Sequence, residues 1–125
     1  MKILIVDDSR IMRNIVKNTL KTMYNLEDGF EEAADGEEAF KIIESSQVDL
    51  MLLDWNMPLL NGVDLVRRLR ALDKYKALPI IMVTSEAAKY NVVEAVKAGV
   101  NDYLVKPVTE KNLFDKVRKY FLEKG

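Results

Sequence analysis

The sequence of 125 residues contains neither cysteine nor histidine. Without cysteine the chain has no disulfide, no thiol nucleophile and no thiolate metal ligand. Without histidine it cannot use imidazole as a general base, a nucleophile or a zinc ligand. Any chemistry must therefore use carboxylates, hydroxyls, lysine or arginine, with or without a hard metal ion.

Long apolar runs and an excess of one charge are also missing. No apolar stretch approaches the roughly 20 residues that span a bilayer, and the apolar run at 3–6 is too short for the core of a signal peptide. The 19 basic side chains nearly balance the 20 acidic ones, which gives no reason to expect a nucleic-acid or membrane partner. We therefore expect a cytoplasmic protein that binds neither nucleic acid nor membranes.

Short apolar runs and helical spacings alternate five times along the chain. The apolar runs predict strands at 3–6, 30–34, 48–53, 80–83 and 103–105. The spacings predict helices at 10–23, 37–45, 63–72 and 87–98, and a last helix capped by Thr109, with loops at 25–29 and 56–62. Gly99 is predicted to end the fourth helix. Because helices separate successive strands, the fold class is α/β with a parallel sheet covered on both faces, in one domain over 1–125.

Polar side chains directly follow the first, third, fourth and fifth predicted strands. Asp7 and Asp8 follow the first strand, Asp54 the third, Thr84 the fourth and Lys106 the fifth. The carboxyl ends of parallel strands meet at one edge of the sheet, where open α/β sheets bind ligands. Three carboxylates at this edge raise one another's pKa unless a cation lies among them. Because only oxygen ligands are available, Mg²⁺ or a similar hard ion is expected, and together with Lys106 a divalent ion balances the three aspartates.

Four segments in this order resemble the receiver domains of two-component response regulators. They are Asp7-Asp8, Asp54-Trp55-Asn56-Met57-Pro58 with Gly62, Val83-Thr84-Ser85-Glu86, and Tyr103-Leu104-Val105-Lys106-Pro107. The resemblance covers essentially the whole chain and is greatest to the single-domain chemotaxis regulators. It implies a flavodoxin-like (βα)5 three-layer sandwich whose five-stranded parallel sheet has the order 2-1-3-4-5.

The resemblance implies that Asp54 is the phosphoacceptor and that Mg²⁺ is the cofactor. Asp8 and the Asp54 carboxylate bind Mg²⁺ directly, the backbone carbonyl of Asn56 supplies a third ligand, and Asp7 acts largely through water. The chain then catalyses only its own phosphorylation and dephosphorylation and is not otherwise an enzyme.

The resemblance also implies residues that switch the domain and set its phosphate lifetime. Lys106 binds the phosphoryl oxygens, and the peptide bond that follows it is expected to be cis. Thr84 moves to bond the phosphoryl group while Tyr103 swings inward behind it. The side chains of Asn56 and Glu86 flank the acceptor and tune the rate of dephosphorylation.

The implied partners are a histidine kinase as phosphodonor, a flagellar motor switch protein as target, and a phosphatase. The chain is expected to be a monomer. The resemblance places a partner-binding face on the fourth helix, the fifth strand and the last helix, at Lys89, Tyr90, Tyr103, Lys116 and Lys119. Ordinary solvated helix faces are the alternative interpretation of these residues.

Other interpretations of the same chain remain open. Asp7-Asp8 alone fits a helix N-cap. An aspartate-nucleophile phosphatase uses the same acid, metal and lysine, but Asn56 stands where such enzymes place an acid. A flavin or nucleotide binder needs a glycine-rich loop where this chain has Asp7-Asp8-Ser9. A receiver in another phosphorelay, a phosphate sink, and a receiver cut from a longer regulator are the remaining alternatives.

Overall fold

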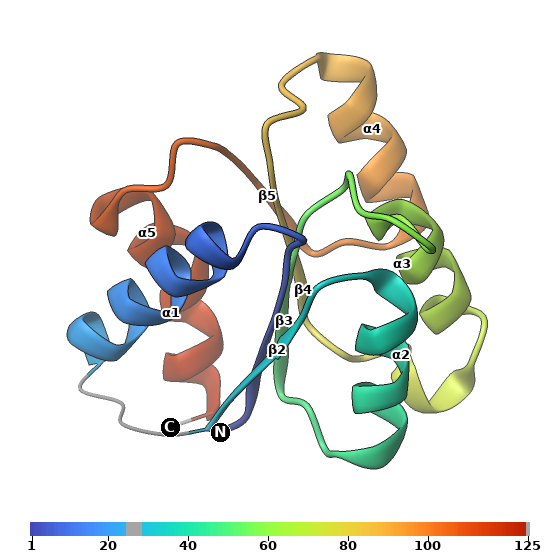
Figure 1. The fold of residues 1–125 in the computed structure, drawn as a ribbon, viewed down its shortest axis with the longest axis horizontal. Coiled ribbons are helices and arrows are strands. Elements are labelled where there is room, and N and C mark those ends of the chain that lie inside the picture. The colour runs from blue at the N-terminus through green and yellow to red at the C-terminus, as the bar shows by residue number, and fades with distance from the viewer. Residues whose placement is uncertain (25–28, 125) are drawn as a thin grey trace.

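A computed structural model describes residues 1–24 and 29–124, which form one parallel sheet between two layers of helices (Figure 1). The strands are β1 (Ile3–Val6), β2 (Phe30–Ala33), β3 (Leu50–Leu53), β4 (Ile80–Thr84) and β5 (Asp102–Val105). The helices are α1 (Arg10–Tyr24), α2 (Gly36–Ser45), α3 (Gly62–Arg70), α4 (Lys89–Ala98) and α5 (Glu110–Lys124), with a short 3₁₀ turn, η1, at Asp73–Tyr75. The sheet order β2-β1-β3-β4-β5, with parallel pairing throughout, confirms the predicted fold.

Each face of the sheet has its own apolar core. Helices α1 and α5 cover one face and α2, α3 and α4 cover the other (Figure 1). Successive strand side chains point to opposite faces, so a strand covered on both sides must be apolar at every position. This explains the continuous runs of β1, β3 and β4, whose members divide between Ile3, Ile5, Leu50, Leu52, Ile81 and Val83 on one side and Leu4, Val6, Met51, Leu53, Ile80 and Met82 on the other.

Side-chain caps set the starts of several helices. The Asp35 carboxylate accepts a hydrogen bond from the backbone N–H of Glu38 before α2. Thr109 and Asn112 bond reciprocally before α5, which confirms the predicted cap at Thr109. Gly99 ends α4 with a φ of 121°, a conformation that glycine adopts without steric cost, as predicted.

The predicted elements differ from the structure mainly at their ends. Strand β3 begins at Leu50, later than predicted, and α4 begins at Lys89 because Ala88 is still extended. In α1 the inward face consists of Val16 and Leu20, while the side chain of Ile11 is 73% exposed, contrary to the predicted face.

The predicted loop at 25–29 lies outside the described residues except for Gly29. Within the described ranges, no helix combines the length and the apolar character needed to cross a membrane.

Candidate functional site: an acidic cluster at the carboxyl edge of the sheet

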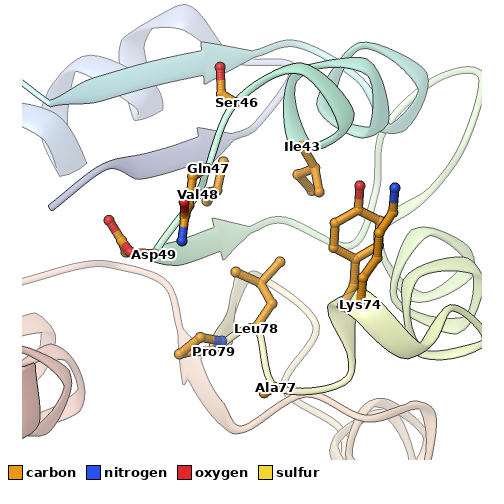
Figure 2. Close-up of a pocket in the computed structure, with 10 residues that line it drawn as sticks. Ile43, Ser46, Gln47, Val48, Asp49, Lys74, Ala77, Leu78 and Pro79 are labelled. Carbon is orange, nitrogen blue, oxygen red and sulfur yellow. The ribbon is translucent and has the colours of Figure 1, made fainter.

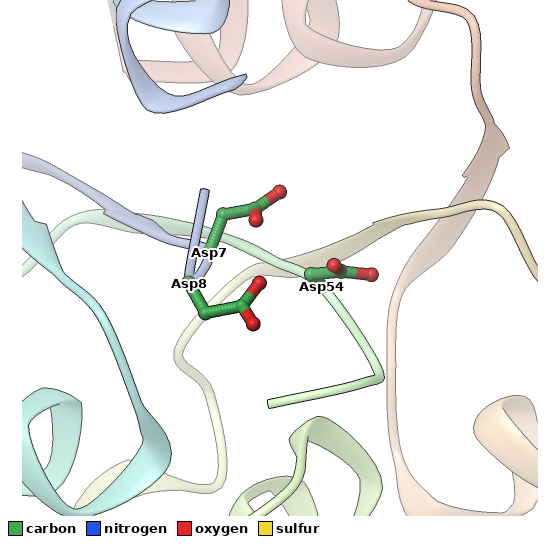
Figure 3. Close-up of side chains that lie close together, drawn as sticks. All are labelled: Asp7, Asp8 and Asp54. Atoms are coloured by element: carbon green, nitrogen blue, oxygen red, sulfur yellow. The ribbon is translucent and has the colours of Figure 1, made fainter. Parts of the chain in front are cut away.

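The carboxyl ends of β1 and β3 bring three aspartates together (Figure 3). Val6 pairs with Leu53 in the parallel register, so the residues that follow these strands lie side by side. One carboxylate oxygen of each of Asp7, Asp8 and Asp54 lies within 4.8 Å of the others. Asp7 and Asp54 are buried and Asp8 is exposed. The predicted convergence of these three residues is therefore what the structure shows.

Lys106 reaches the same cluster from the end of β5. Its Nζ lies 2.9 Å from Asp7 Oδ2 and 3.3 Å from Asp54 Oδ2. Burial lowers the pKa of Lys106, but the two carboxylates outweigh burial and raise this pKa above its ordinary value. Lys106 is therefore a charged partner of both buried acids. We call Asp7, Asp8, Asp54 and Lys106 the acid site.

The environment of Asp54 leaves its negative charge incompletely compensated. Burial raises the pKa of the Asp54 carboxyl above its ordinary value, and the nearby Asp7 raises it further. Lys106, the Thr84 hydroxyl and the backbone N–H of Trp55, which donates to Asp54 Oδ1 at 2.7 Å, act in the opposite direction without cancelling the effect. An additional cation at this site would stabilise the ionised carboxylate.

The first turn of α1 tests the alternative that Asp7 and Asp8 merely cap a helix. The start of α1 is capped by Ser9, whose hydroxyl accepts a hydrogen bond from the backbone N–H of Met12 at 3.2 Å. Asp7 Oδ1 accepts the N–H of Ser9 at 2.9 Å, while its Oδ2 binds Lys106. Among the described residues, Asp8 forms no hydrogen bond or ion pair. Its carboxylate is thus free to bind an added cation, and capping does not account for the pair.

A glycine allows the loop after β3 to pass close to the acceptor strand. A Cβ atom at Gly62 would lie 2.2 Å from the backbone oxygen of Asp54, so no larger residue fits without a shift of the backbone. The N–H of Gly62 donates to the carbonyl of Trp55 at 2.8 Å. This contact fixes the loop that carries Asn56 beside the acid site.

Thr84, Glu86 and Tyr103 form a second layer beside the acid site. The Tyr103 ring is half-buried against the core, and its hydroxyl donates to the backbone carbonyl of Glu86 at 2.5 Å. Burial, followed by the negative charges of Glu86 and Asp54, raises the pKa of Tyr103 to about 12. The Glu86 carboxylate accepts hydrogen bonds from the side chains of Asn56 and Asn91. Hydrogen bonds thus connect Glu86 to three other residues named from the resemblance, Asn56, Thr84 and Tyr103. Asn91 is a further partner of Glu86.

The sequence alone does not distinguish Asn91 as a site residue. Asn91 is a buried polar residue in the first turn of α4. The one available signal was an amide side chain at the start of a predicted helix, which in sequence alone is indistinguishable from a solvated position.

The residues assigned to a partner face divide into two groups. Lys89 and Tyr90 are exposed at the start of α4, where they line a shallow hollow with Val93, Glu94 and Lys97. Lys116 and Lys119 of α5 instead bind the carboxylate of Asp102, at 3.0 Å and 3.1 Å.

The peptide bond between Lys106 and Pro107 is cis, as predicted.

A separate hollow of about 290 Å³ lies at the opposite, amino edge of the sheet (Figure 2). It is lined by Ile43, Ser46, Gln47, Val48, Asp49, Lys74, Tyr75, Ala77, Leu78 and Pro79. No residue of the acid site contributes to this lining. The chemistry predicted from the sequence therefore belongs to the carboxyl edge and not to this hollow.

Comparison with known proteins gives a consistent family. Residues 3–118 match the model of the response regulator receiver domain. The chain is 46% identical over 124 residues to the chemotaxis protein CheY of Pseudomonas aeruginosa, covering 97% of this chain and 96% of that protein. It is 48% identical over 118 residues to a CheY homolog of Campylobacter jejuni, covering 94% and 89% of the two chains. Among solved structures, chemotaxis protein CheY4 of Vibrio cholerae superposes with a TM-score of 0.84 at 33% identity, covering 95% of this chain and 97% of that one.

Proposed function

Because the chain belongs to the response regulator receiver domain family, we propose that it is a phosphorylation-controlled signalling domain whose phosphoacceptor is Asp54. The observation that carries the proposal is the charge imbalance of the acid site, where three clustered carboxylates face the one ammonium group of Lys106. A site with this imbalance favours the binding of a divalent cation and, after it, of a group that the cation and lysine can neutralise.

The acid site fits Mg²⁺ by its donor atoms and its charge. Three carboxylates and Lys106 have a formal charge of −2, which one Mg²⁺ offsets. We propose that Asp8, Asp54 and the backbone carbonyl of Asn56 bind the ion directly, and that Asp7 acts through water. When bound, the ion screens the negative charges of the acceptor carboxylate and the phosphoryl oxygens.

The proposed reaction takes a phosphoryl group from a phosphohistidine of a histidine kinase. A carboxylate oxygen of Asp54 attacks phosphorus, the P–N bond breaks, and its electron pair remains on the imidazole nitrogen of the kinase, which takes up a proton from solvent. The acyl phosphate formed on Asp54 carries two negative charges. Lys106 contacts the Asp54 carboxylate, and the Thr84 hydroxyl acts to lower the pKa of the same carboxyl. Both groups are therefore positioned to bind the new phosphoryl oxygens.

We propose that phosphorylation acts on partners through the layer formed by Thr84, Glu86 and Tyr103. The Thr84 hydroxyl accepts the N–H of Glu86 at 3.4 Å, a long contact that it can give up for a phosphoryl oxygen. Since the same Glu86 holds the hydroxyl of Tyr103, this exchange alters the surface formed by α4 and β5. Lys89, Tyr90, Tyr103, Lys116 and Lys119 are the proposed partner face.

The similarity to chemotaxis proteins supports a specific output. We propose that the phosphorylated domain binds a flagellar motor switch protein and acts as a cytoplasmic monomer, since the relatives reported above are chemotaxis proteins. The proposed phosphoryl chemistry does not depend on this assignment of the partner.

Labelling with ³²P-acetyl phosphate tests the acceptor. We expect Mg²⁺-dependent incorporation into the wild type and at least a hundredfold less into Asp54→Asn, because an amide cannot form the acyl phosphate. Asp102→Asn, which removes a carboxylate outside the acid site, is the matched control and should label normally. Label that survives Asp54→Asn would contradict the proposal. If a motor-switch peptide bound phosphorylated and unphosphorylated protein equally well, the chemotaxis output would be wrong. The assignment of Asp54 as the phosphoacceptor would still hold.

A further inference from the structure

Glu86 joins four separate parts of the molecule. Its carboxylate accepts a hydrogen bond from Asn56 Nδ2 at 2.7 Å and from Asn91 Nδ2 at 3.3 Å. Its backbone N–H donates to Thr84 Oγ1, and its carbonyl accepts the Tyr103 hydroxyl. The loop that follows Asp54, the end of β4, the start of α4 and β5 are therefore linked through one residue of the β4–α4 connection.

Asn91 is the member of this set that anchors Glu86 to α4. Asn91 is 9% exposed, and asparagine is a poor helix former, so a buried asparagine in the first turn of a helix requires a compensating contact. The cap residue Ala88 offers no side-chain hydrogen bond to this turn. The contact between the Asn91 amide and the Glu86 carboxylate therefore fixes Glu86 relative to the first turn of α4.

The fixed carboxylate in turn holds the side chain of Asn56. Asn56 is two residues after Asp54, and its amide is joined to Glu86 by the shorter of the two hydrogen bonds, at 2.7 Å. This hydrogen bond joins the loop that follows Asp54 to the loop that follows Thr84, at the ends of the neighbouring strands β3 and β4. Both side chains are tied through Asn91 to a helix that makes no direct contribution to the acid site.

We propose that Asn91 is a positioning residue that slows hydrolysis of the phosphoryl group on Asp54, an inference that rests on the proposed acceptor function. In hydrolysis a water oxygen attacks phosphorus and the P–O bond to Asp54 breaks. The electron pair returns to the carboxylate, and both protons of the water remain on inorganic phosphate. While Asn91 holds Glu86, the joined side chains of Asn56 and Glu86 restrict the approach of this water. Without Asn91, Glu86 can rotate and release the Asn56 amide, which opens that approach.

The test is the decay of ³²P-labelled protein after the donor is removed. We expect Asn91→Ala to lose label about three- to tenfold faster than the wild type, the effect of one hydrogen bond on a rate. Asn91→Asp keeps the shape of the side chain but sets a carboxylate against Glu86, so it should also decay faster. Val92→Ala, which trims the neighbouring half-buried residue of α4 without touching Glu86, is the control and should decay like the wild type.

A double-mutant cycle separates positioning from a general loosening of α4. If Asn91 acts through Glu86, Asn91→Ala should change the decay rate no further in a Glu86→Ala background. An unchanged decay in both Asn91 variants, or the same acceleration in the Glu86→Ala background, would overturn the inference while leaving the acceptor in place. A wild type that takes up no label would instead overturn the proposed acceptor function, and this inference with it.

Discussion

Two charge clusters lie at the two ends of β5, and their proportions are opposite. At the far end of the strand, Lys106 is shared by the buried carboxylates of Asp7 and Asp54. At its start, the carboxylate of Asp102 is shared by Lys116 and Lys119 of α5, which we call the Asp102 cluster. The first has too little positive charge for its acids, and the second has more than its one acid requires.

The pKa values of the two aspartates, Asp54 and Asp102, are shifted in opposite directions. Burial raises the pKa of Asp54, and the single lysine does not reverse the effect. Burial also raises the pKa of Asp102, but the hydrogen bonds from Lys116, the Tyr103 backbone and Lys119 outweigh it, so the pKa is lowered overall. The acid site thus holds a charge at a cost in stability, whereas the Asp102 cluster gains stability from its charge. A site that must accept a cation and a phosphoryl group is expected to be of the first kind.

Removing one lysine from each cluster should produce the largest difference in the free energy of unfolding between the two clusters. Lys106→Met leaves two buried carboxylates without their cation, and we expect it to lower the free energy of unfolding by about 2–4 kcal/mol without Mg²⁺. Lys116→Met leaves Asp102 with Lys119, and being partly exposed it should cost less than about 1 kcal/mol. Urea unfolding at pH 7 measures both. Equal losses would show that the two clusters are energetically alike.

Added Mg²⁺ should compensate the acid site and leave the Asp102 cluster unaffected. At a concentration twenty times the dissociation constant, binding to the folded state adds about 1.8 kcal/mol to the free energy of unfolding. Asp8→Asn removes the exposed carboxylate of the site, so we expect the variant to be at least as stable as the wild type without Mg²⁺ and to gain little from it. Thermal unfolding with and without Mg²⁺ provides the measurement, with Mg²⁺-free buffer containing EDTA as the reference.

Asp102→Asn is the control for this titration, because it removes a carboxylate that lies outside the acid site and is already paired with lysine. It should keep the full response to Mg²⁺. A response lost in both variants, or in neither, would contradict the assignment of the cation to the acid site.

The extent to which the sequence predicts these features follows from the range of the interactions. The strands β1, β3 and β4 were predictable because strands buried on both faces must be apolar throughout, and parallel order then places Asp7, Asp54 and Lys106 on one edge. By contrast, the Asp102 cluster depends on the docking of α5 against β5, which no local pattern records.

Side-chain orientation was the other part that the sequence left undetermined. In α1, helical spacing is compatible with inward faces that differ by one residue, and packing selects Val16 and Leu20 over Ile11 and Ile15. Likewise, the bond between Asn91 and Glu86 needs the path of the β4–α4 connection, which begins α4 two residues later than predicted. The charged residues of the acid site were predictable, whereas Asn91, whose amide binds Glu86, was not.

The smallest expected effect is the pH dependence, which separates the clusters by sign. Because the folded pKa of Asp54 is raised above the ordinary 3.8, its penalty is absent below that value and grows as the pH rises through the folded pKa. Because the folded pKa of Asp102 is lowered from 3.8, its contribution is present above that value and is lost as the pH falls through the folded pKa. In Mg²⁺-free buffer, Asp54→Asn should therefore gain stability over the wild type between pH 4 and 7, measured by urea unfolding. Asp102→Asn should be less stable than the wild type at pH 7 and approach it below pH 4. If both differences changed with pH in the same direction, the contrast between a site built to receive charge and one built to hold the fold would be wrong.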